Sequence, residues 1–211
     1  MTSTGAVTRG LTAKTMRLLV VLATAAPLWT FATALGQENT RTVLSPKEIL
    51  KLYGPAVVRI EVVKDQVAKG HGTGFIVSPD GLIITNYHVM QKAFPAYVKL
   101  ASGEIYDRID VVEWDPRRDL AVIKIPGFNL STVIFGDSDR IEVGSPVVVI
   151  GNPLELDLSI SSGLISGIRV KEGHRQVQIS AAISPGSSGS PVYGAGSEDS
   201  RCGALQLGED S

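Results

Sequence analysis

Residues 183–191 read Ile183-Ser184-Pro185-Gly186-Ser187-Ser188-Gly189-Ser190-Pro191, and apolar residues stand on both sides of this segment. Glycine adopts backbone angles that other residues avoid and proline fixes its own φ, so the composition predicts a tight turn between two short strands. Such a turn can direct successive backbone N–H groups at one point, which is what a developing oxyanion requires. Ser188 is then a candidate nucleophile beside its own oxyanion hole. A serine- and glycine-rich surface loop is the alternative that the segment alone leaves open.

The composition indicates one compact domain of the all-β class. The chain has 211 residues, of which 44% are hydrophobic and 19% charged, and this is enough for a real core. Its 22 glycines and the scarcity of long helix-period stretches favour strands joined by many turns. The formal net charge of −1, without a dense cluster of Lys and Arg, argues against nucleic acid as a partner. Cys202 is the only cysteine, so no internal disulfide can form.

The N-terminus has the pattern of an export signal. Three basic residues precede an apolar run from Leu18 to Leu35, namely Arg9, Lys14 and Arg17. The run ends in small residues, which predicts a secretory signal peptide cleaved near Ala34 or Gly36. An uncleaved membrane anchor is the alternative, because the run is close to the shortest length that spans a bilayer. A start at Met1 or at Met16 leaves a basic region in place.

A short helix and then a series of strands follow. Ser45 is a suitable N-cap, Pro46 fits the first helical position and Glu48 completes a capping box, while Gly54-Pro55 ends the helix. From there, short β-branched stretches alternate with turn residues at intervals of roughly ten, the spacing of a sandwich or barrel. The expected strands are 56–63, 72–77, 82–85, 97–100, 104–113, 120–125, 133–135, 146–151, 158–170, 176–182, 191–193 and 203–207.

Three polar residues stand at the ends or edges of these elements. His88 follows the predicted strand 82–85, Asp119 opens the apolar run 120–125, and Ser188 lies in the predicted turn. A rigid β scaffold can bring side chains from different strand ends together. Imidazole can then take the serine proton, a carboxylate can hold the imidazole in one tautomer, and the N–H groups of the turn can stabilise the oxyanion. The chain order His, Asp, Ser is one of the few known for this triad.

These segments, taken together and in order, resemble the trypsin-like serine peptidases and, within them, the bacterial HtrA (Deg-like) branch. The similarity covers about residues 46–208 and rests on five blocks: Gly72-Thr73-Gly74-Phe75-Ile76-Val77, Thr85-Asn86-Tyr87-His88-Val89, Asp119-Leu120-Ala121-Val122, Gly151-Asn152-Pro153 and Pro185-Gly186-Ser187-Ser188-Gly189-Ser190-Pro191. The resemblance implies two antiparallel six-stranded β-barrels with the active site between them. It also implies His88 as the general base, Asp119 as its orienting carboxylate and Ser188 as the nucleophile. The backbone N–H groups of Gly186 and Ser188 would form the oxyanion hole.

The resemblance further implies where a substrate binds. Ala182, six residues before Ser188, would lie at the base of the primary specificity pocket. Lys and Arg find no carboxylate partner there, so small or medium aliphatic side chains are expected at the cleaved position. Gln206, Leu207 and Gly208 would form the strand that pairs with the substrate backbone by β-augmentation. No cofactor and no metal is expected.

Other polar residues receive structural or surface interpretations. Asp115 is expected to begin a turn, and His71, in a glycine-rich segment, is expected to face solvent. Four more residues are left out of the site, namely His174, Ser187, Ser190 and Cys202.

The chain departs from the family pattern at several positions. Ser180 and Ser184 stand where Asp and Asn are usual, and Ser190 where Gly is commoner. Glu155 replaces a usual Gly, which would alter a loop near the cleft. No PDZ domain is expected after the protease. The 23 residues 189–211 leave room for the substrate strand but not for the last strand and closing helix, so we expect a second barrel with an open edge, which invites pairing with another chain.

We therefore expect a signal peptide or membrane anchor over residues 1–36, a linker over 37–44 and a protease domain over 45–211, with barrels at about 56–135 and 146–211. The expected function is an exported serine endopeptidase, periplasmic or extracellular, that cleaves unfolded or extended polypeptides through an acyl-enzyme. Two alternatives use the same fold: a catalytically impaired peptide-binding or chaperone-like relic, and a hydrolase of small esters. A polypeptide substrate is the expected partner. A membrane is a partner only of an uncleaved chain, and the open edge is compatible with a homo-oligomer.

Overall fold

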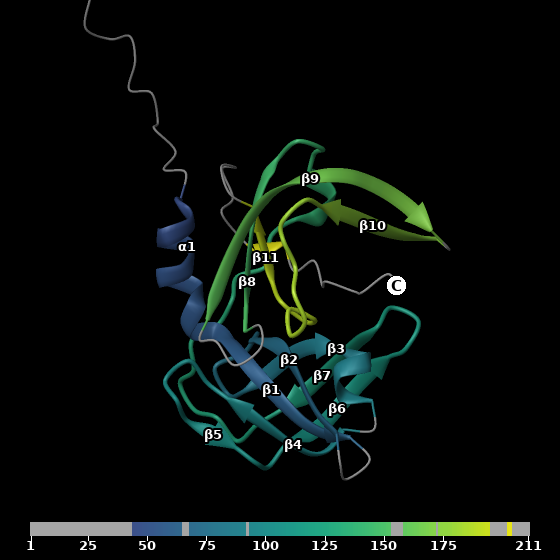
Figure 1. Cartoon of the computed structure of the whole chain (residues 1–211). Helices are drawn as coiled ribbons and strands as arrows, with labels where there is room; N and C mark the ends of the chain where they lie inside the picture. Colours follow the sequence, from purple (N-terminus) through teal and green to yellow (C-terminus); the bar gives the residue numbers. More distant parts are fainter. Residues whose placement is uncertain are drawn as a thin grey trace, which may run out of the picture. The chain divides into compact units, whose positions relative to one another are not determined.

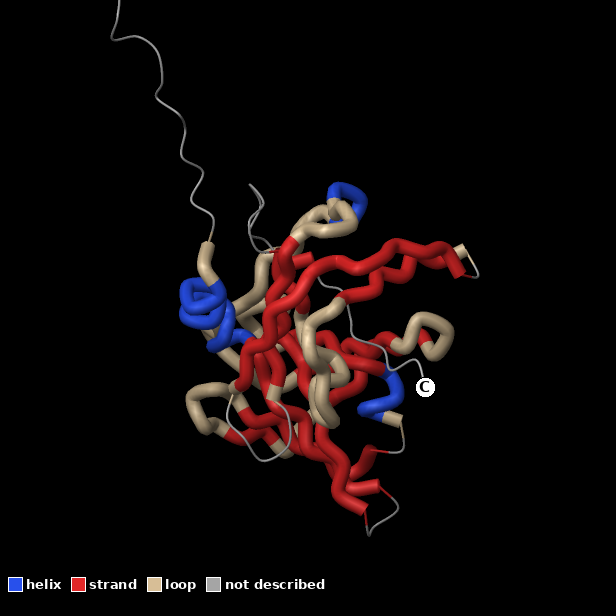
Figure 2. The backbone as a smooth tube through the Cα atoms, turned by 45° about the horizontal axis from the view of Figure 1, so that its top comes forward, coloured by secondary structure: helices blue, strands red, loops and turns tan. Residues whose placement is uncertain are grey.

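A computed structural model describes residues 44–64, 68–91, 93–152, 158–171, 173–194 and 202–203. The expected signal or anchor segment 1–36 lies outside these residues, as does the linker except for Leu44. Within the described part the helices are α1 (Pro46–Tyr53), η1 (Gly54–Ala56), α2 (Tyr87–Met90) and η2 (Ser138–Arg140). The strands are β1 (Val57–Lys64), β2 (Ala68–Ile76), β3 (Leu82–Asn86), β4 (Ala93–Lys99), β5 (Ile105–Tyr106), β6 (Asp110–Asp115), β7 (Leu120–Lys124), β8 (Pro146–Gly151), β9 (Ser159–Lys171), β10 (His174–Ile179), β11 (Val192–Gly194) and β12 (Cys202–Gly203). Strands therefore dominate, as Figure 2 shows, and the all-β prediction is confirmed.

Helix α1 begins with the predicted capping box. The Ser45 side chain accepts a hydrogen bond from the Glu48 backbone N–H, and the Glu48 carboxylate accepts one from the Ser45 backbone N–H at 2.8 Å. The Ser45 hydroxyl also donates to this carboxylate at 2.7 Å, and this bond, together with the one from the Ser45 backbone N–H, holds the pKa of the Glu48 carboxyl below its usual value. Ile49 and Tyr53 form the buried face of the helix. No helix of the described residues is both long enough and apolar enough to cross a bilayer.

The first sheet has seven strands in the order β5-β4-β1-β2-β3-β7-β6. Only residues 107–109 connect β5 to β6, although these strands are the two edges of the sheet. The four residue steps from Tyr106, the end of β5, to Asp110, the start of β6, span at most about 14 Å when fully extended. In a flat sheet the six spacings between these two edge strands would separate them by about 29 Å. The sheet must therefore curl until its edges approach, and Figure 1 shows β1–β7 wound in this way. This sheet corresponds to the predicted first barrel.

Two strand predictions for this barrel need correction. The predicted strand 104–113 is two strands, β5 and β6, because its halves pair with β4 and β7 at opposite edges of the sheet. The predicted strand 133–135 is a loop with one isolated bridge at Phe135. Its Val133 N–H donates to the Ile76 carbonyl at 2.9 Å, which anchors the segment without a ladder. Both errors arise because strand pairing depends on distant partners that local composition does not reveal.

The second sheet has the order β10-β9-β8-β11-β12 among the described strands, and every pairing in both sheets is antiparallel. Strand β9 pairs with β8 through its first half and with β10 through its second half. Of the predicted strand 203–207, residue Gly203 lies in β12 and residues 204–207 lie outside the described part. Two antiparallel β units with a short N-terminal helix are thus confirmed. The first sheet has seven strands where six are expected, because segment 104–113 forms two of them, and five strands of the second sheet lie in the described residues.

Strand β8 links the cores of the two sheets because it buries both of its faces. Val148 and Ile150 belong to the large cluster built on the first sheet, while Val147 and Val149 belong to a smaller cluster in the second. The large cluster also contains Tyr53 and Tyr193, whose rings stack with centroids 4.8 Å apart. This stack ties α1 to β11, the strand that follows the Ser188 segment.

Candidate active site

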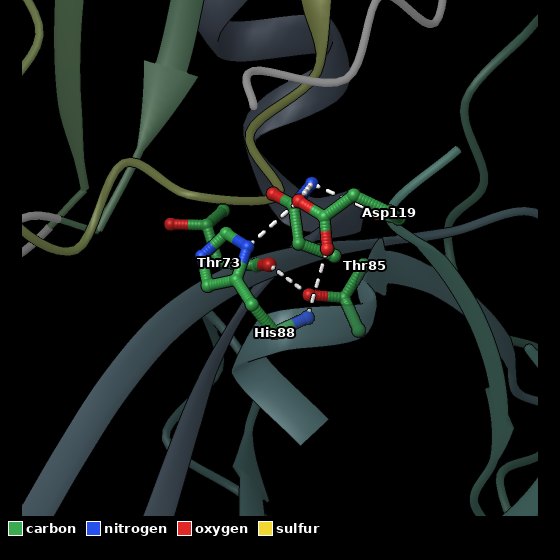
Figure 3. A network of polar contacts seen from close by, with 5 residues as sticks. Thr73, Thr85, His88 and Asp119 are labelled. Atoms are coloured by element: carbon green, nitrogen blue, oxygen red, sulfur yellow. Dashed lines mark hydrogen bonds and ion pairs between the residues drawn. The ribbon is translucent and has the colours of Figure 1, made fainter. Parts of the chain in front are cut away.

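His88 and Asp119 lie side by side because their strands are paired. Strand β3 pairs with β7 with Asn86 opposite Leu120, so the residues just beyond these ends are neighbours. His88 stands in the one-turn helix α2 directly after β3, and its Nδ1 is 2.7 Å from Asp119 Oδ2. The His88 backbone N–H donates to the other carboxylate oxygen at 2.9 Å (Figure 3). The paired ends of β3 and β7 therefore place these two side chains next to each other.

The backbone at Asp119 is shaped to present its carboxylate. Asp119 has φ of 53°, in the left-handed region that few residues other than glycine adopt, although Asp and Asn tolerate it best. Its carbonyl accepts the Tyr87 N–H at 3.0 Å, and its Oδ2 also accepts from Asn86 Nδ2 at 2.9 Å. The side chains of His88 and Asp119 are 36% and 31% exposed, so a reactant can reach a pair that is otherwise enclosed.

The Ser188 segment is a pair of tight turns, as the composition predicts. The Ser187 N–H donates to the Ser184 carbonyl at 2.9 Å, and the Ser190 N–H donates to the Ser187 carbonyl at 3.0 Å. Gly186 and Gly189 have φ of 95° and 83°, which L side chains rarely adopt. At Gly189 a Cβ would also lie 2.1 Å from the Thr73 carbonyl oxygen, so only glycine fits there.

The Ser188 segment rests on strand β2 beside the His88–Asp119 pair. The Thr73 N–H donates to the Ser188 carbonyl at 2.8 Å, and the Thr73 hydroxyl donates to the Gly186 carbonyl at 2.7 Å. Thr85, on β3, donates its hydroxyl to the Thr73 carbonyl at 2.7 Å. Figure 1 shows the chain before β11 descending to β2 and β3, and Figure 3 shows Thr73, Thr85, His88 and Asp119 gathered there. The fold thus gathers four segments, around residues 73, 88, 119 and 188, at one place.

The structure corrects the interpretation of His71. Its Nε2 is buried without a hydrogen-bond partner among the described residues, and its ring lies against Gly186 rather than facing solvent. A Cβ built on Gly186 would be 2.6 Å from His71 Cδ2. The missing side chain at Gly186 leaves the space that the imidazole fills, and sequence spacing alone does not reveal this contact.

The remaining candidates fall into three groups. Asp115 begins a turn as predicted, because its Oδ1 accepts the N–H groups of Arg117 at 2.9 Å and Arg118 at 3.2 Å. Ala182 is exposed in the segment between β10 and the Ser188 turn. Glu155 and the predicted substrate strand Gln206, Leu207 and Gly208 lie outside the described residues. No group of three or more metal-ligating side chains is found in the described part of the chain.

Thr73, Thr85 and Asn86 are site residues to which the sequence analysis gave no individual role. Each is fully buried and polar, and each holds a functional segment in place through a hydrogen bond given above. A polar residue between two glycines, as in Gly72-Thr73-Gly74, was the available signal, because glycines in a strand mark close approach of another backbone.

Comparison with known proteins assigns the family. The model of the trypsin-like peptidase domain matches residues 72–198. A DegP-like periplasmic serine endoprotease of Chlamydia muridarum is 35% identical over 161 residues, which are 74% of this chain and 32% of that protein. A protein of the same description from Halomonas elongata is 40% identical over 138 residues, 60% of this chain and 29% of that protein. The chain belongs to the trypsin-like peptidases.

Solved structures place the chain within one branch of that family. The HtrA-type protease AlgW, solved with a tripeptide, superposes with a TM-score of 0.67 at 30% identity, covering 78% of this chain and 53% of that one. Deg5 superposes with a TM-score of 0.64 at 29% identity, covering 80% and 84%. The chain is therefore an HtrA-type serine protease domain. It spans about a third of the length of the curated relatives it matches, at 32% and 29% of the two above.

Proposed function

We propose that the protein is an exported serine endopeptidase that hydrolyses peptide bonds through an acyl-enzyme. Ser188 is the nucleophile, His88 the general base and Asp119 the residue that orients His88. The observation that carries the proposal is the bond of 2.7 Å between His88 Nδ1 and Asp119 Oδ2, next to a Ser188 turn that is itself bonded to β2. The proposed protease domain covers residues 45–211, with barrels at about 56–135 and 146–211.

The hydrogen bonds of Asp119 define which nitrogen of His88 can act as a base. Asp119 Oδ2 can only accept, so Nδ1 carries the proton and Nε2 presents its lone pair. In the proposed first step Nε2 takes the Ser188 hydroxyl proton while Oγ attacks the scissile carbonyl carbon. The carbonyl oxygen becomes an oxyanion that accepts from the N–H groups of Gly186 and Ser188. His88 then gives the proton to the leaving amine, and the C–N bond breaks to leave an ester on Ser188.

The second half of the reaction repeats these roles with water. His88 takes a proton from a water molecule, whose oxygen attacks the ester carbonyl and forms a second oxyanion in the same hole. Collapse of this intermediate breaks the bond to Ser188 Oγ, which recovers its proton from His88. No group other than the protein and water is needed for the balance.

The proposed substrate is an unfolded or extended polypeptide with a small aliphatic residue at the cleaved position. Ala182 offers no carboxylate for Lys or Arg, and Gln206, Leu207 and Gly208 are proposed to pair with the substrate backbone. The names of the curated relatives, which are endoproteases, and the tripeptide in the AlgW structure support a polypeptide as the substrate. The same names and the basic, apolar N-terminus support a periplasmic or other exported location.

Digestion of an unfolded protein tests the proposal. The 211-residue chain is incubated with reduced casein, beside a Ser188→Ala variant, and cleavage is followed by mass spectrometry. Cleavage by the parent alone, after aliphatic residues, supports the proposal. Binding of casein without cleavage by a folded parent would favour the peptide-binding relic, and turnover of small esters without casein cleavage would favour an esterase.

A further inference from the structure

Thr73 uses every polar group it has to join β2 to the segment around Ser188. Thr73 is fully buried, with 0% of its surface exposed. Its N–H donates to the Ser188 carbonyl, and its hydroxyl donates to the Gly186 carbonyl while accepting the Asn152 N–H at 3.0 Å. Its carbonyl accepts the Thr85 hydroxyl. No other described residue is bonded to carbonyls on both sides of Ser187 in this way.

The two carbonyls held by Thr73 determine the orientation of the peptide planes in the turn. In the peptide plane between Gly186 and Ser187, the carbonyl oxygen accepts a hydrogen bond from the Thr73 hydroxyl, and the N–H donates to the Ser184 carbonyl. In the peptide plane between Ser188 and Gly189, the carbonyl oxygen accepts a hydrogen bond from the Thr73 N–H. The proposed oxyanion donors, Gly186 N–H and Ser188 N–H, belong to the planes adjacent to these. Because neighbouring planes share the torsions of one Cα, a rotation of the 186–187 plane would turn both donors.

From this geometry we infer that Thr73 is a positioning residue for catalysis, whose hydroxyl holds the oxyanion turn in its working conformation. The inference rests on the proposed function and adds a residue to it. Thr73 does not contact the reacting atoms; it acts through the Gly186 carbonyl. Gly186 has φ of 95° here, but a glycine can adopt many other backbone angles. The hydrogen bond from the Thr73 hydroxyl to its carbonyl is therefore what selects this conformation.

The side chain can be tested with two nearly matched replacements. Valine has the shape of threonine but cannot donate, so Thr73→Val frees the Gly186 carbonyl and the Asn152 N–H while keeping the backbone bond to Ser188. Serine keeps the hydroxyl and loses one methyl group. Loss of one oxyanion donor lowers kcat by about 100- to 1,000-fold, and a misplacement of about 1 Å costs about 100-fold, so Thr73→Val is expected to lower kcat by roughly 30- to 100-fold with KM changed less than about threefold. Thr73→Ser is expected to recover most of this loss.

The experiment measures kcat and KM on a fluorogenic peptide together with the rate of fluorophosphonate labelling, for the parent, Thr73→Val, Thr73→Ser and Val98→Ala. Val98 is buried in β4, which is not bonded to the turn, so its variant reports the effect of lost stability alone. Each protein is assayed below its own unfolding midpoint. If Thr73→Val does not fold, Thr73→Ala is compared with Thr73→Ser in its place.

The inference is supported if kcat and the labelling rate fall in Thr73→Val, recover in Thr73→Ser and stay at the parent values in Val98→Ala. Parent-like kcat in a folded Thr73→Val overturns it and leaves the proposed triad intact. A loss of the same size in Val98→Ala also overturns it, because the effect would then be one of stability. A folded parent that neither cleaves nor labels refutes the proposed function itself, and this outcome is distinguishable because it appears before any variant is compared.

Discussion

Replacement of Asp119 by asparagine separates the geometry of the site from its chemistry. Asparagine tolerates the left-handed φ of 53° at this position, so Asp119→Asn changes the side chain without adding backbone strain. The carboxylate accepts hydrogen bonds from His88 Nδ1 and Asn86 Nδ2 on Oδ2, and from the His88 N–H on Oδ1. An amide has only one acceptor atom, so at least one donor must face the new NH2 group.

The consequence for catalysis follows from where the amide oxygen settles. If it takes the Oδ1 position, the NH2 group donates to His88 Nδ1, and the imidazole proton moves to Nε2, where no base remains for Ser188. If it takes the Oδ2 position, the NH2 group faces the His88 backbone N–H and helix α2 must shift. A carboxylate-to-amide change in such a triad costs about 10⁴ in kcat, or about 5 kcal/mol of activation free energy.

The assay is steady-state cleavage of a fluorogenic peptide at neutral pH, with urea unfolding to confirm that the variant is folded. Asp115→Asn is the matched control, because an amide oxygen can replace Asp115 Oδ1 as the acceptor of the Arg117 and Arg118 backbone N–H groups. The other oxygen, Oδ2, makes an exposed ion pair of 3.8 Å with Arg118 Nε, and a surface pair of this kind contributes little. We expect a loss of about 10³ to 10⁴ in kcat for Asp119→Asn and unchanged kcat for Asp115→Asn. A folded Asp119→Asn that keeps kcat within about tenfold of the parent would show that the Asp119 carboxylate does not set the His88 tautomer for catalysis.

Three further predictions concern the supports of the site. Gly186→Ala is expected to lower activity at least about tenfold, because its Cβ would meet the His71 ring at φ of 95°; adding His71→Ala should recover part of the loss, and a double variant no better than the single one would exclude this contact as the cause. Tyr53→Ala is expected to lower the free energy of unfolding by about 3 kcal/mol, because a buried ring stacked on Tyr193 is lost; urea unfolding measures this, and a change below about 1 kcal/mol would contradict it. Ser45→Ala removes the helix cap and is expected to lower Tm by about 2–4 °C at pH 7. The pKa of Glu48 is lowered in the folded state, so the stabilisation that depends on the Glu48 charge is present above its unfolded pKa and is lost as pH falls through its folded pKa. The Tm difference between parent and Ser45→Ala should therefore be smaller at pH 3 than at pH 7, and an equal difference would refute the role of the charge.

The sequence was sufficient where a local pattern carried the information. The capping box of α1 follows from Ser45, Pro46 and Glu48 within four positions. The approach of His88 and Asp119 follows from two apolar strands that each end at a polar residue, provided that the strands pair. The turn around Ser188 follows from its glycines, both of which have positive φ.

The parts that could not be predicted depend on contacts between distant segments. Thr73 and Gly186 are 113 positions apart, and nothing in either neighbourhood specifies that a hydroxyl meets a carbonyl. The same holds for His71, whose ring fills space left by a glycine in another sheet. The split of 104–113 into β5 and β6 is a consequence of sheet closure, which is decided by the whole sheet and not by the propensity of these residues.

Covalent labelling at Ser188 tests the central proposal most directly. The folded 211-residue chain is treated with a fluorophosphonate, and the adduct is located by mass spectrometry of the peptides, with Ser188→Ala and His88→Ala as controls. We expect one adduct per chain, on Ser188, that is absent from Ser188→Ala and forms far more slowly in His88→Ala. A folded parent that takes up no label, or takes it up equally on Ser187 or Ser190, would contradict it.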